Sequence, residues 1–291
     1  MNILPKIKIK KDLKAEANMF QKFLHHPYYL QNRNFIFQAF PELEIQLKKS
    51  KNEKGVLEKF IANFHKTNKD AIDQIIKKSN AIINKKGGRA LVALSNLMDY
   101  KWSRSIIYKA IPTILPFSPF GNNIFYFSIL GQIKGKNKKD ALFIAIHEIS
   151  HFIFYDILKE IEQEIKKSAP DDLKNYLKET LTAALLNRKP LSDILNLHNY
   201  KGNPEIRDLQ IKKSNGAIVS FTEFIDEYYQ IIKVKNKKTF KVFLQEILNV
   251  LLPISKEFSK KRAIWNRYGN QLYKKPSALN LYQKPIQIKK G

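Results

Sequence analysis

The sequence of 291 residues contains no cysteine, which excludes disulfide bonds and thiolate metal sites. A metal ion bound by this chain must therefore be held by histidine, aspartate or glutamate side chains. Because the chain has only 6 histidines, the position of each one is informative.

The sequence also lacks an unbroken apolar run of the length that a membrane span requires, about 18 residues. His147 and Glu148 interrupt one of the longest apolar runs, and Gln245 and Glu246 interrupt another. The N-terminal segment MNILPKIKIKKDLKAEANMF carries lysines where a secretion signal would be apolar. We therefore expect no membrane span and a cytoplasmic protein.

Arginine is scarce although the chain is strongly basic. The formal net charge is +26, yet arginine accounts for only 7 of the 52 basic residues. Arginine makes bidentate contacts to bases and phosphates, whereas the lysines here are scattered through polar runs such as KKSKNEK and VKNKK. This pattern predicts weak, non-specific nucleic-acid binding at most. A basic protein that binds nucleic acid or another partner is the alternative to an enzyme, and its metal site would be structural or degenerate.

With 44% hydrophobic residues, the chain can bury the core of one large domain or of two smaller ones. The glycine pair in KKGG, residues 85–88, is the clearest break in the pattern. We divide the chain there into a helical N-terminal region (1–87), a core region (88–200) and a helical C-terminal region (201–291). The tail from Lys274 onward shows no periodicity.

Periodicity and turn residues predict the elements of the core region. Segments 106–117 and 122–133 are short, rich in β-branched and aromatic residues, and bounded by proline and glycine, which favours strands. Asp140 can cap a helix that begins at Ala141 and continues to about Lys167. Pro170 begins a second helix, which runs through LKNYLKETLTAALLN and ends near Lys189-Pro190.

The stretch ALFIAIHEISHFIFYDIL, residues 141–158, places His147, Glu148 and His151 in apolar surroundings. Burying these side chains costs free energy unless something compensates them. On a helix the two imidazoles project from one face a turn apart and can bind one ion. Glu148 can take a proton from metal-bound water, as in the HExxH motif of zinc enzymes. The structural alternative is a pair of core histidines that are hydrogen-bonded to backbone carbonyls.

A catalytic Zn²⁺ needs a third protein ligand. The extended motif HExxHxxGxxH is absent, because HFIFYDI has neither its glycine nor its histidine. Glu179 lies among apolar residues in LKNYLKETLTAALLN, on a helix that can pack antiparallel to the first one. We therefore predict Glu179 as the third ligand; its alternative role is that of an exposed helix charge paired with a lysine.

The strand, the HExxH helix and the glutamate on the next helix resemble the gluzincin branch of the zincin metallopeptidases, the thermolysin-like arrangement. The resemblance covers residues 106–187, and HExxH is its specific motif. It implies a zincin-like catalytic core with a small β-sheet, an active-site helix and a ligand helix. With the helical regions that periodicity predicts on both sides of this core, we expect an α+β, predominantly helical fold. It also implies that His147, His151 and Glu179 bind zinc and that a peptide or protein is the substrate. Glu148 would be the general base.

The resemblance has implications outside the motif as well. The segment NNIFYFSIL, residues 122–130, matches the edge strand to which a substrate peptide adds in such enzymes. His198 or Tyr200 would stabilise the oxyanion; the alternative for each is an ordinary loop residue. Many relatives carry an acidic residue four positions after the ligand glutamate to orient a histidine, whereas this chain has Ala183 there. Another group must therefore fix that imidazole.

His25 and His26 are adjacent and precede Pro27. Adjacent residues of a helix point about 100° apart and rarely share a metal, and proline indicates a helix end. We expect a capping or packing role for this histidine pair.

Overall fold

The computed structural model describes residues 4–102, 105–135 and 140–288. The chain is α+β and predominantly helical, as predicted. It divides into two compact units: unit 1 comprises Met1–Leu91 and Trp102–Glu148, and unit 2 comprises Val92–Lys101 and Ile149–Gly291.

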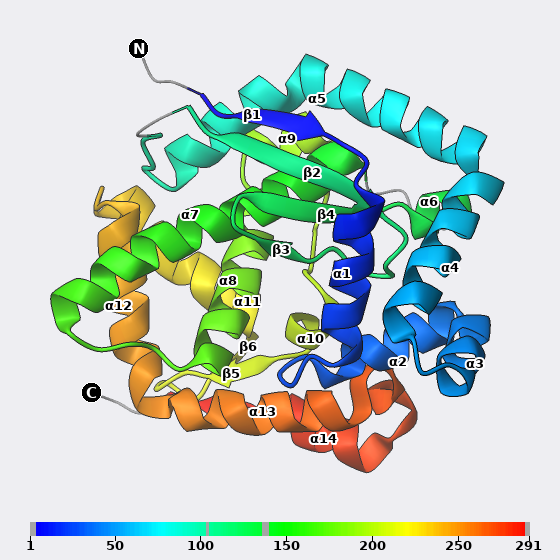
Figure 1. Cartoon of the computed structure of the whole chain (residues 1–291). Coiled ribbons are helices and arrows are strands. Elements are labelled where there is room, and N and C mark those ends of the chain that lie inside the picture. Colours follow the sequence, from blue (N-terminus) through cyan, green and yellow to red (C-terminus); the bar gives the residue numbers. More distant parts are fainter. Residues whose placement is uncertain (1–3, 103–104, 136–139, 289–291) are drawn as a thin grey trace. The chain divides into compact units, whose positions relative to one another are not determined.

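Unit 1 contains a four-stranded sheet in the order β1-β2-β4-β3. β1 (Lys6–Ile9), β2 (Ile107–Thr113) and β4 (Ile124–Ser128) are parallel neighbours, and the short β3 (Phe120–Gly121) runs antiparallel to β4 (Figure 1). Most side chains of β2 and β4 are buried, which explains why both segments read as apolar runs without polar alternation. The strands predicted within 106–117 and 122–133 are thus confirmed at 107–113 and 124–128, whereas Leu130–Ile133 forms the short helix α6 and β1 was missed.

β4 is an inner strand, so the prediction that residues 122–130 form the edge of the sheet is wrong. β2 pairs with one side of β4, and β3 pairs with the other side. Beyond β3, the N–H of Tyr126 donates to the carbonyl of Pro119 at 2.8 Å, and that of Ser128 donates to the Ser118 hydroxyl at 3.2 Å. The chain before β4 therefore folds back along it and accepts hydrogen bonds from the backbone N–H groups with which a substrate strand would pair.

Helices complete unit 1. α1 (Leu13–Leu24) begins after Asp12, whose carboxylate accepts the N–H of Ala15 at 2.9 Å. It packs against α4 (Glu53–Thr67). The rings of Phe40 and Phe60 meet edge to face, with centroids 5.2 Å apart. The remaining short helices are α2 (Leu30–Ala39), α3 (Pro41–Lys49), α4 (Glu53–Thr67) and α6 (Leu130–Ile133).

A buried polar cluster joins three elements of unit 1. The carboxylate of Glu16 on α1 is 1% exposed. One of its oxygens lies 2.8 Å from Nε2 of His65 on α4. The other accepts the Thr113 hydroxyl at 2.9 Å and the N–H of Ile114 at 2.6 Å. Helix α1, helix α4 and the end of β2 are therefore tied to a single buried carboxylate.

The helix α5 (Lys69–Leu97) continues through KKGG, so the predicted break at residues 85–88 is wrong. A glycine in a helix costs about 1 kcal/mol relative to alanine, which packing can offset. Gly87 is buried, and a Cβ on it would lie 3.4 Å from the Ile83 side chain, whereas Gly88 faces open space. Ala90 and Leu91 follow in the core and fix the helix beyond the glycines.

The predicted helix at Ala141–Lys167 is confirmed as α7 (Ala141–Ile165). Asp140 caps it, since its carboxylate accepts the N–H of Phe143 at 2.8 Å. Among the described residues, α7 is the one helix long and apolar enough to cross a membrane, and 78% of its most apolar window is buried. Such burial is typical of a helix in a protein core.

Unit 2 is built around α8 (Asp171–Leu186), which confirms the second predicted helix. Nearly every residue of α8 from Leu173 onward is buried, and α11 (Phe221–Tyr228) and α13 (Ser255–Tyr268) pack against it. The other elements of unit 2 are α9 (Leu191–Leu195), α10 (Pro204–Arg207), a π-helical turn (Tyr229–Lys235), α12 (Phe240–Leu251), 3-10 segments (Leu252–Ile254 and Gly269–Lys274), and the sheet β6-β5-β7 formed by Ile218–Ser220, Gln210–Lys212 and Ile286–Gln287.

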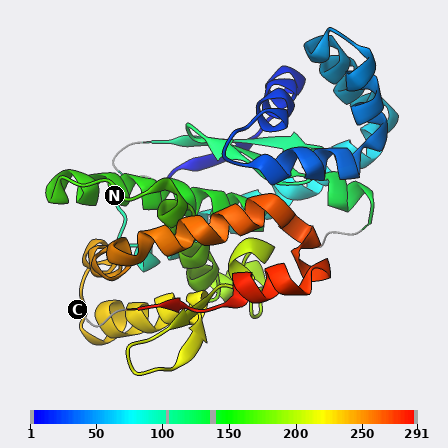
Figure 2. The ribbon, with the colours of Figure 1, turned by 90° about the horizontal axis from the view of Figure 1, so that it is seen from below.

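Although the tail from Lys274 onward shows no periodicity, residues Pro276–Gln283 form α14 beside α13 (Figure 2). Tyr282 is fully buried there. Lys261 of α13 donates to the carbonyls of Leu281, Tyr282 and Lys284, at 2.8, 2.6 and 2.6 Å, and so caps the end of α14. Burial lowers the pKa of Lys261 to about 8. The helix is short, and it depends on these tertiary contacts more than on its own periodicity.

Candidate metal centre

The HExxH residues lie on the buried part of α7. His151 is 1% and Glu148 4% exposed, and His147 is partly buried. Because α7 is continuous through the motif, His147 and His151 lie on one helix face, a turn apart. The ring of His147 also lies near Phe143, one turn earlier, with centroids 6.1 Å apart.

Glu179 approaches these histidines from α8. Its carboxylate oxygen Oε1 lies 3.3 Å from Nε2 of His151, and its side chain is 13% exposed. One ligand atom from each of His147, His151 and Glu179 lies within 4.8 Å of the others. The structure thus brings together the three residues that the sequence singled out as metal ligands. Two imidazoles and one carboxylate are the donor set of a thermolysin-type catalytic zinc site, so the residues present fit that ion.

Thr182 is the group that fixes the imidazole of His151, and sequence reasoning missed it. Its hydroxyl lies 3.2 Å from Nδ1 of His151 and 2.6 Å from the hydroxyl of Ser150. When Nδ1 carries the proton and donates it to Thr182, Nε2 presents its lone pair toward Glu179. The signal in the sequence was a polar residue three positions after Glu179, on the same face of a buried helix.

Lys178 also reaches the site, and sequence reasoning missed it as well. Its ammonium donates to Oε1 of Glu179, and the lysine is only 3% exposed. The alternative prediction for Glu179 was an exposed charge paired with a lysine. Glu179 does pair with a lysine, but Lys178 is buried. Both the ammonium and Nε2 of His151 contact the same carboxylate oxygen.

Glu148 stands apart from the ligand group. It directly follows His147 and is buried, yet the group that could hold an ion consists of the two histidines and Glu179. A carboxylate beside a metal centre, and not part of it, is where a general base is expected.

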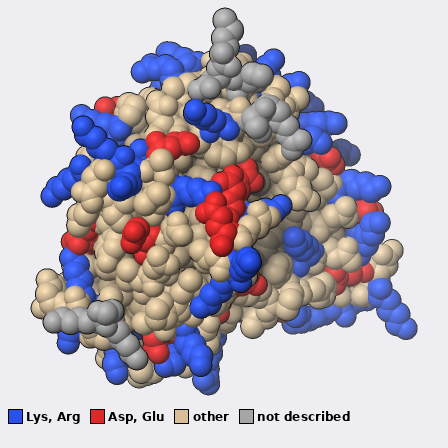
Figure 3. Space-filling view, turned by 90° about the vertical axis from the view of Figure 1, so that its left-hand side faces the viewer, with Lys and Arg blue, Asp and Glu red and all other residues tan. Residues whose placement is uncertain are grey.

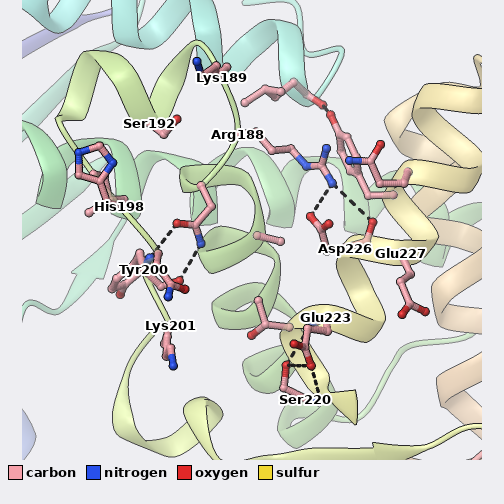
Figure 4. Close-up of a pocket in the computed structure, with 18 of the residues that line it drawn as sticks. Arg188, Lys189, Ser192, His198, Tyr200, Lys201, Ser220, Glu223, Asp226 and Glu227 are labelled. Carbon is pink, nitrogen blue, oxygen red and sulfur yellow. Dashed lines mark hydrogen bonds and ion pairs between the residues drawn. The ribbon is translucent and has the colours of Figure 1, made fainter. Parts of the chain in front are cut away.

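His198 and Tyr200 line a cavity of about 1500 Å³ in unit 2 (Figure 4). The amide of Asn187, just after α8, holds their loop: it donates to the carbonyl of Tyr200 and accepts its N–H, both at 2.7 Å. Gly202 has φ +77°, and a Cβ there would lie 3.4 Å from that of Ala183. This loop is thus held against α8 one turn after Glu179, but among the described residues neither His198 nor Tyr200 joins the ligand group.

The same cavity carries charges of both signs. Arg188 forms an ion pair with Asp226 (Figure 4). Its guanidinium also lies over the ring of Tyr229, 4.0 Å from the ring centroid. Burial raises the pKa of Tyr229 to about 12. Glu223 caps α11 through Ser220, and hydrogen bonds from the Ser220 N–H and hydroxyl lower the pKa of its carboxyl group. These groups are engaged with one another, and they do not present a single sign of charge to a ligand.

The histidine pair His25-His26 has the predicted capping and packing role. His25 ends α1 and lies 2.9 Å from the Glu53 carboxylate. Nδ1 of His26 accepts the N–H groups of Tyr28 and Tyr29 at 3.2 and 3.4 Å. Its ring stacks on Phe23, with centroids 5.4 Å apart.

The basic surface is divided by acidic residues. Figure 3 shows Lys and Arg in separate groups over the visible face, with Asp and Glu among them. Lys241 lies 3.1 Å from Glu160 and 2.6 Å from Glu164. Lys69 and Lys11 both pair with Asp73 and lower the pKa of its carboxyl group to about 2.

No protein-family model, curated protein or solved structure matches this chain. A function for the site therefore rests on its own residues.

Proposed function

We propose that this chain is a zinc-dependent metallopeptidase with a gluzincin-like site. The observation that carries the proposal is the approach of His147, His151 and Glu179, whose ligand atoms lie within 4.8 Å of one another. Helices α7 and α8 would then be the active-site helix and the ligand helix of a zincin-like core. Such a donor set leaves a fourth position of the ion open for a reacting group.

The chemistry divides between the ion and the chain. A bound Zn²⁺ supplies a Lewis acid that polarises a carbonyl and lowers the pKa of water toward about 7. His147 and His151 would hold it from α7, and Glu179 would hold it from α8. Glu148 accepts the proton of the attacking water and returns it to the leaving amine. Because Glu148 is buried, bulk water does not compete with the attacking water for its carboxylate.

Thr182 contributes by holding the proton on Nδ1 of His151, which leaves Nε2 free to bind the metal. The hydroxyl of Ser150, 2.6 Å away, holds Thr182 in turn. Because β4 is covered by the chain before it, a substrate peptide would have to lie against another part of the protein than that strand.

The test separates the metal ligands from the base. Glu148→Gln should keep one zinc per chain but lose peptide hydrolysis by about a hundredfold or more, as expected for removal of a general base. His147→Ala and His151→Ala should lose the metal. Metal content is measured by atomic emission on protein purified without a His tag, beside cleavage of a peptide library. Glu160→Gln, an exposed carboxylate on the same helix, is the matched control and should change neither quantity.

Release of zinc by Glu148→Gln would contradict the assigned roles. A protein that binds no zinc, with the same melting temperature before and after chelator treatment, would overturn the metal centre itself. Zinc that stays bound in a chain that cleaves nothing would favour the alternative, a binding protein with a structural site.

A further inference from the structure

Lys178 is a buried lysine at the candidate metal centre. Its side chain is 4% exposed, and its ammonium donates to Oε1 of Glu179. Burying an ammonium costs several kcal/mol unless an opposite charge compensates it. Here the compensating charge is the carboxylate that is also the predicted third ligand of zinc.

The surroundings of Lys178 point to a role at the metal centre and not only to an ion pair. Thr182, one turn further along α8, contacts Nδ1 of His151, and Glu179 contacts Nε2 of the same ring. Lys178, Glu179 and Thr182 thus approach His151 from neighbouring positions of one helix. Lys174, one turn earlier, differs: it lies 3.1 Å from Glu162 and donates to the Ser168 hydroxyl at 2.9 Å, neither of which belongs to the ligand group, and its side chain is 16% exposed.

The Lys178 ammonium and a metal ion bound from solution would therefore both contact the carboxylate of Glu179. The ammonium and Nε2 of His151 meet at one oxygen of Glu179. In a buried site with low effective dielectric constant, an ammonium and a divalent ion held by one carboxylate repel each other strongly. Binding of the ion must weaken or displace the contact of Lys178. Loss of the ion, in contrast, leaves Glu179 with a counter-charge.

We propose that Lys178 is an internal counter-cation that competes with zinc for Glu179. It lowers the metal affinity of the site and holds the ligand carboxylate in place when the metal is absent. The inference rests on the proposed function, because it assumes that the three ligands bind zinc. Its consequence is a site that exchanges its metal and responds to the zinc concentration, instead of holding the ion permanently.

The experiment compares the zinc dissociation constants of the full-length wild type and of Lys178→Met, measured by competition with a chromogenic chelator. Methionine has a similar length without the charge, so zinc should bind about tenfold tighter or more. Lys178→Gln keeps a hydrogen-bond donor and should also bind zinc more tightly than the wild type. Lys174→Met, on the same helix, is the matched control and should leave the dissociation constant unchanged.

A second measurement does not depend on zinc. In excess chelator, Lys178→Met should melt at a lower temperature than the wild type, because the Glu179 carboxylate has lost its counter-charge. The double variant Lys178→Met/Glu179→Gln should recover most of that loss, since the carboxylate is then neutral. A lysine with a merely structural role would change the melting temperature by the same amount in zinc and in chelator.

The outcomes separate this inference from the proposed function. Equal or weaker zinc binding by both Lys178 variants, with a wild type that binds zinc, would overturn the role of Lys178 and leave the metal centre standing. If neither the wild type nor any Lys178 variant binds zinc at millimolar concentration, both proposals fail.

Discussion

Two side chains of α8 lie at the ring nitrogens of His151: the Thr182 hydroxyl is 3.2 Å from Nδ1, and Oε1 of Glu179 is 3.3 Å from Nε2. A histidine ligand whose second nitrogen donates to a fixed acceptor is held in one tautomer and one orientation, and loss of that acceptor weakens metal binding. In this chain the group at Nδ1 is the hydroxyl of Thr182. A neutral acceptor orients the ring but adds no negative charge to the site.

Thr182→Val should therefore weaken zinc binding by about tenfold to a hundredfold, because valine keeps the shape of threonine and removes the acceptor. The dissociation constant is measured by chelator competition. Thr180→Val is the matched control: Thr180 lies on the same helix and is equally buried, and its hydroxyl makes no hydrogen bond among the described residues. That control should bind zinc like the wild type. Equal affinities of the Thr182 and Thr180 variants would show that Thr182 does not position His151.

The sequence predicted the three residues of the candidate metal centre but not the groups around them, for a geometric reason. A spacing of four residues on a helix places His147 and His151 on one face whatever the rest of the fold. Glu179 stood out as a charge in an apolar helix. Thr182 and Lys178 are ordinary residues of that helix, and their roles depend on how α8 is rotated about its axis. A rotation of about 100°, one residue step, would place a different set against His151.

At the scale of elements, the cluster around Glu16 is the clearest example of a long-range polar contact that holds unit 1 together. Glu16 and Thr113 are 97 positions apart in the chain, and both are buried. In the sequence, Glu16 is one charged residue of a lysine-rich N-terminal segment, and nothing relates it to His65. β1 was missed for a related reason: its alternation of Lys and Ile is four residues long, and only pairing with β2 makes it a strand.

Glu16→Ala should destabilise unit 1 by about 3–5 kcal/mol, because it leaves His65, the Thr113 hydroxyl and the N–H of Ile114 buried without their common acceptor. The free energy of unfolding is measured by urea titration in excess chelator, so that metal binding does not contribute. Thr113→Val removes one of these bonds and also the bond that the same hydroxyl accepts from the N–H of Leu115, and it should cost only about 2 kcal/mol. Equal losses for the two variants would mean that the carboxylate does not hold the cluster.

The helices that were predicted correctly are those whose ends carry local signals. Asp140 caps α7 through its own side chain, and Pro170 precedes α8. Prediction failed where tertiary contacts, and not the local sequence, determine whether a helix forms or continues. The glycines of KKGG remain helical inside α5, and α14 forms because Lys261 and the buried Tyr282 hold it. Local chemistry thus sets where a helix begins more reliably than it sets where one must end.

At the scale of the whole molecule, salt separates the two candidate functions. Nucleic-acid binding through the net charge of +26 would depend on the salt concentration, whereas metal binding in a buried site would hardly depend on it. Attraction to nucleic acid depends on displaced counterions and weakens steeply with salt concentration. Contacts between buried ligands and an ion are hardly screened by mobile ions. The lysines that pair with Asp73, Glu160 and Glu164 show that part of the basic surface is already neutralised by the chain's own carboxylates.

The last prediction concerns this difference. Binding to duplex DNA or RNA should be weak and indifferent to sequence, and it should collapse between about 50 and 200 mM salt, because scattered lysines act as point charges. The zinc content and the rate of peptide cleavage should persist over the same range. Gel-shift titrations and cleavage assays on one preparation measure both, with Glu148→Gln as a control that keeps the charge pattern outside the site. Tight, sequence-selective binding at 200 mM salt, in a chain that cleaves no peptide, would move the assignment from the peptidase to a nucleic-acid-binding protein.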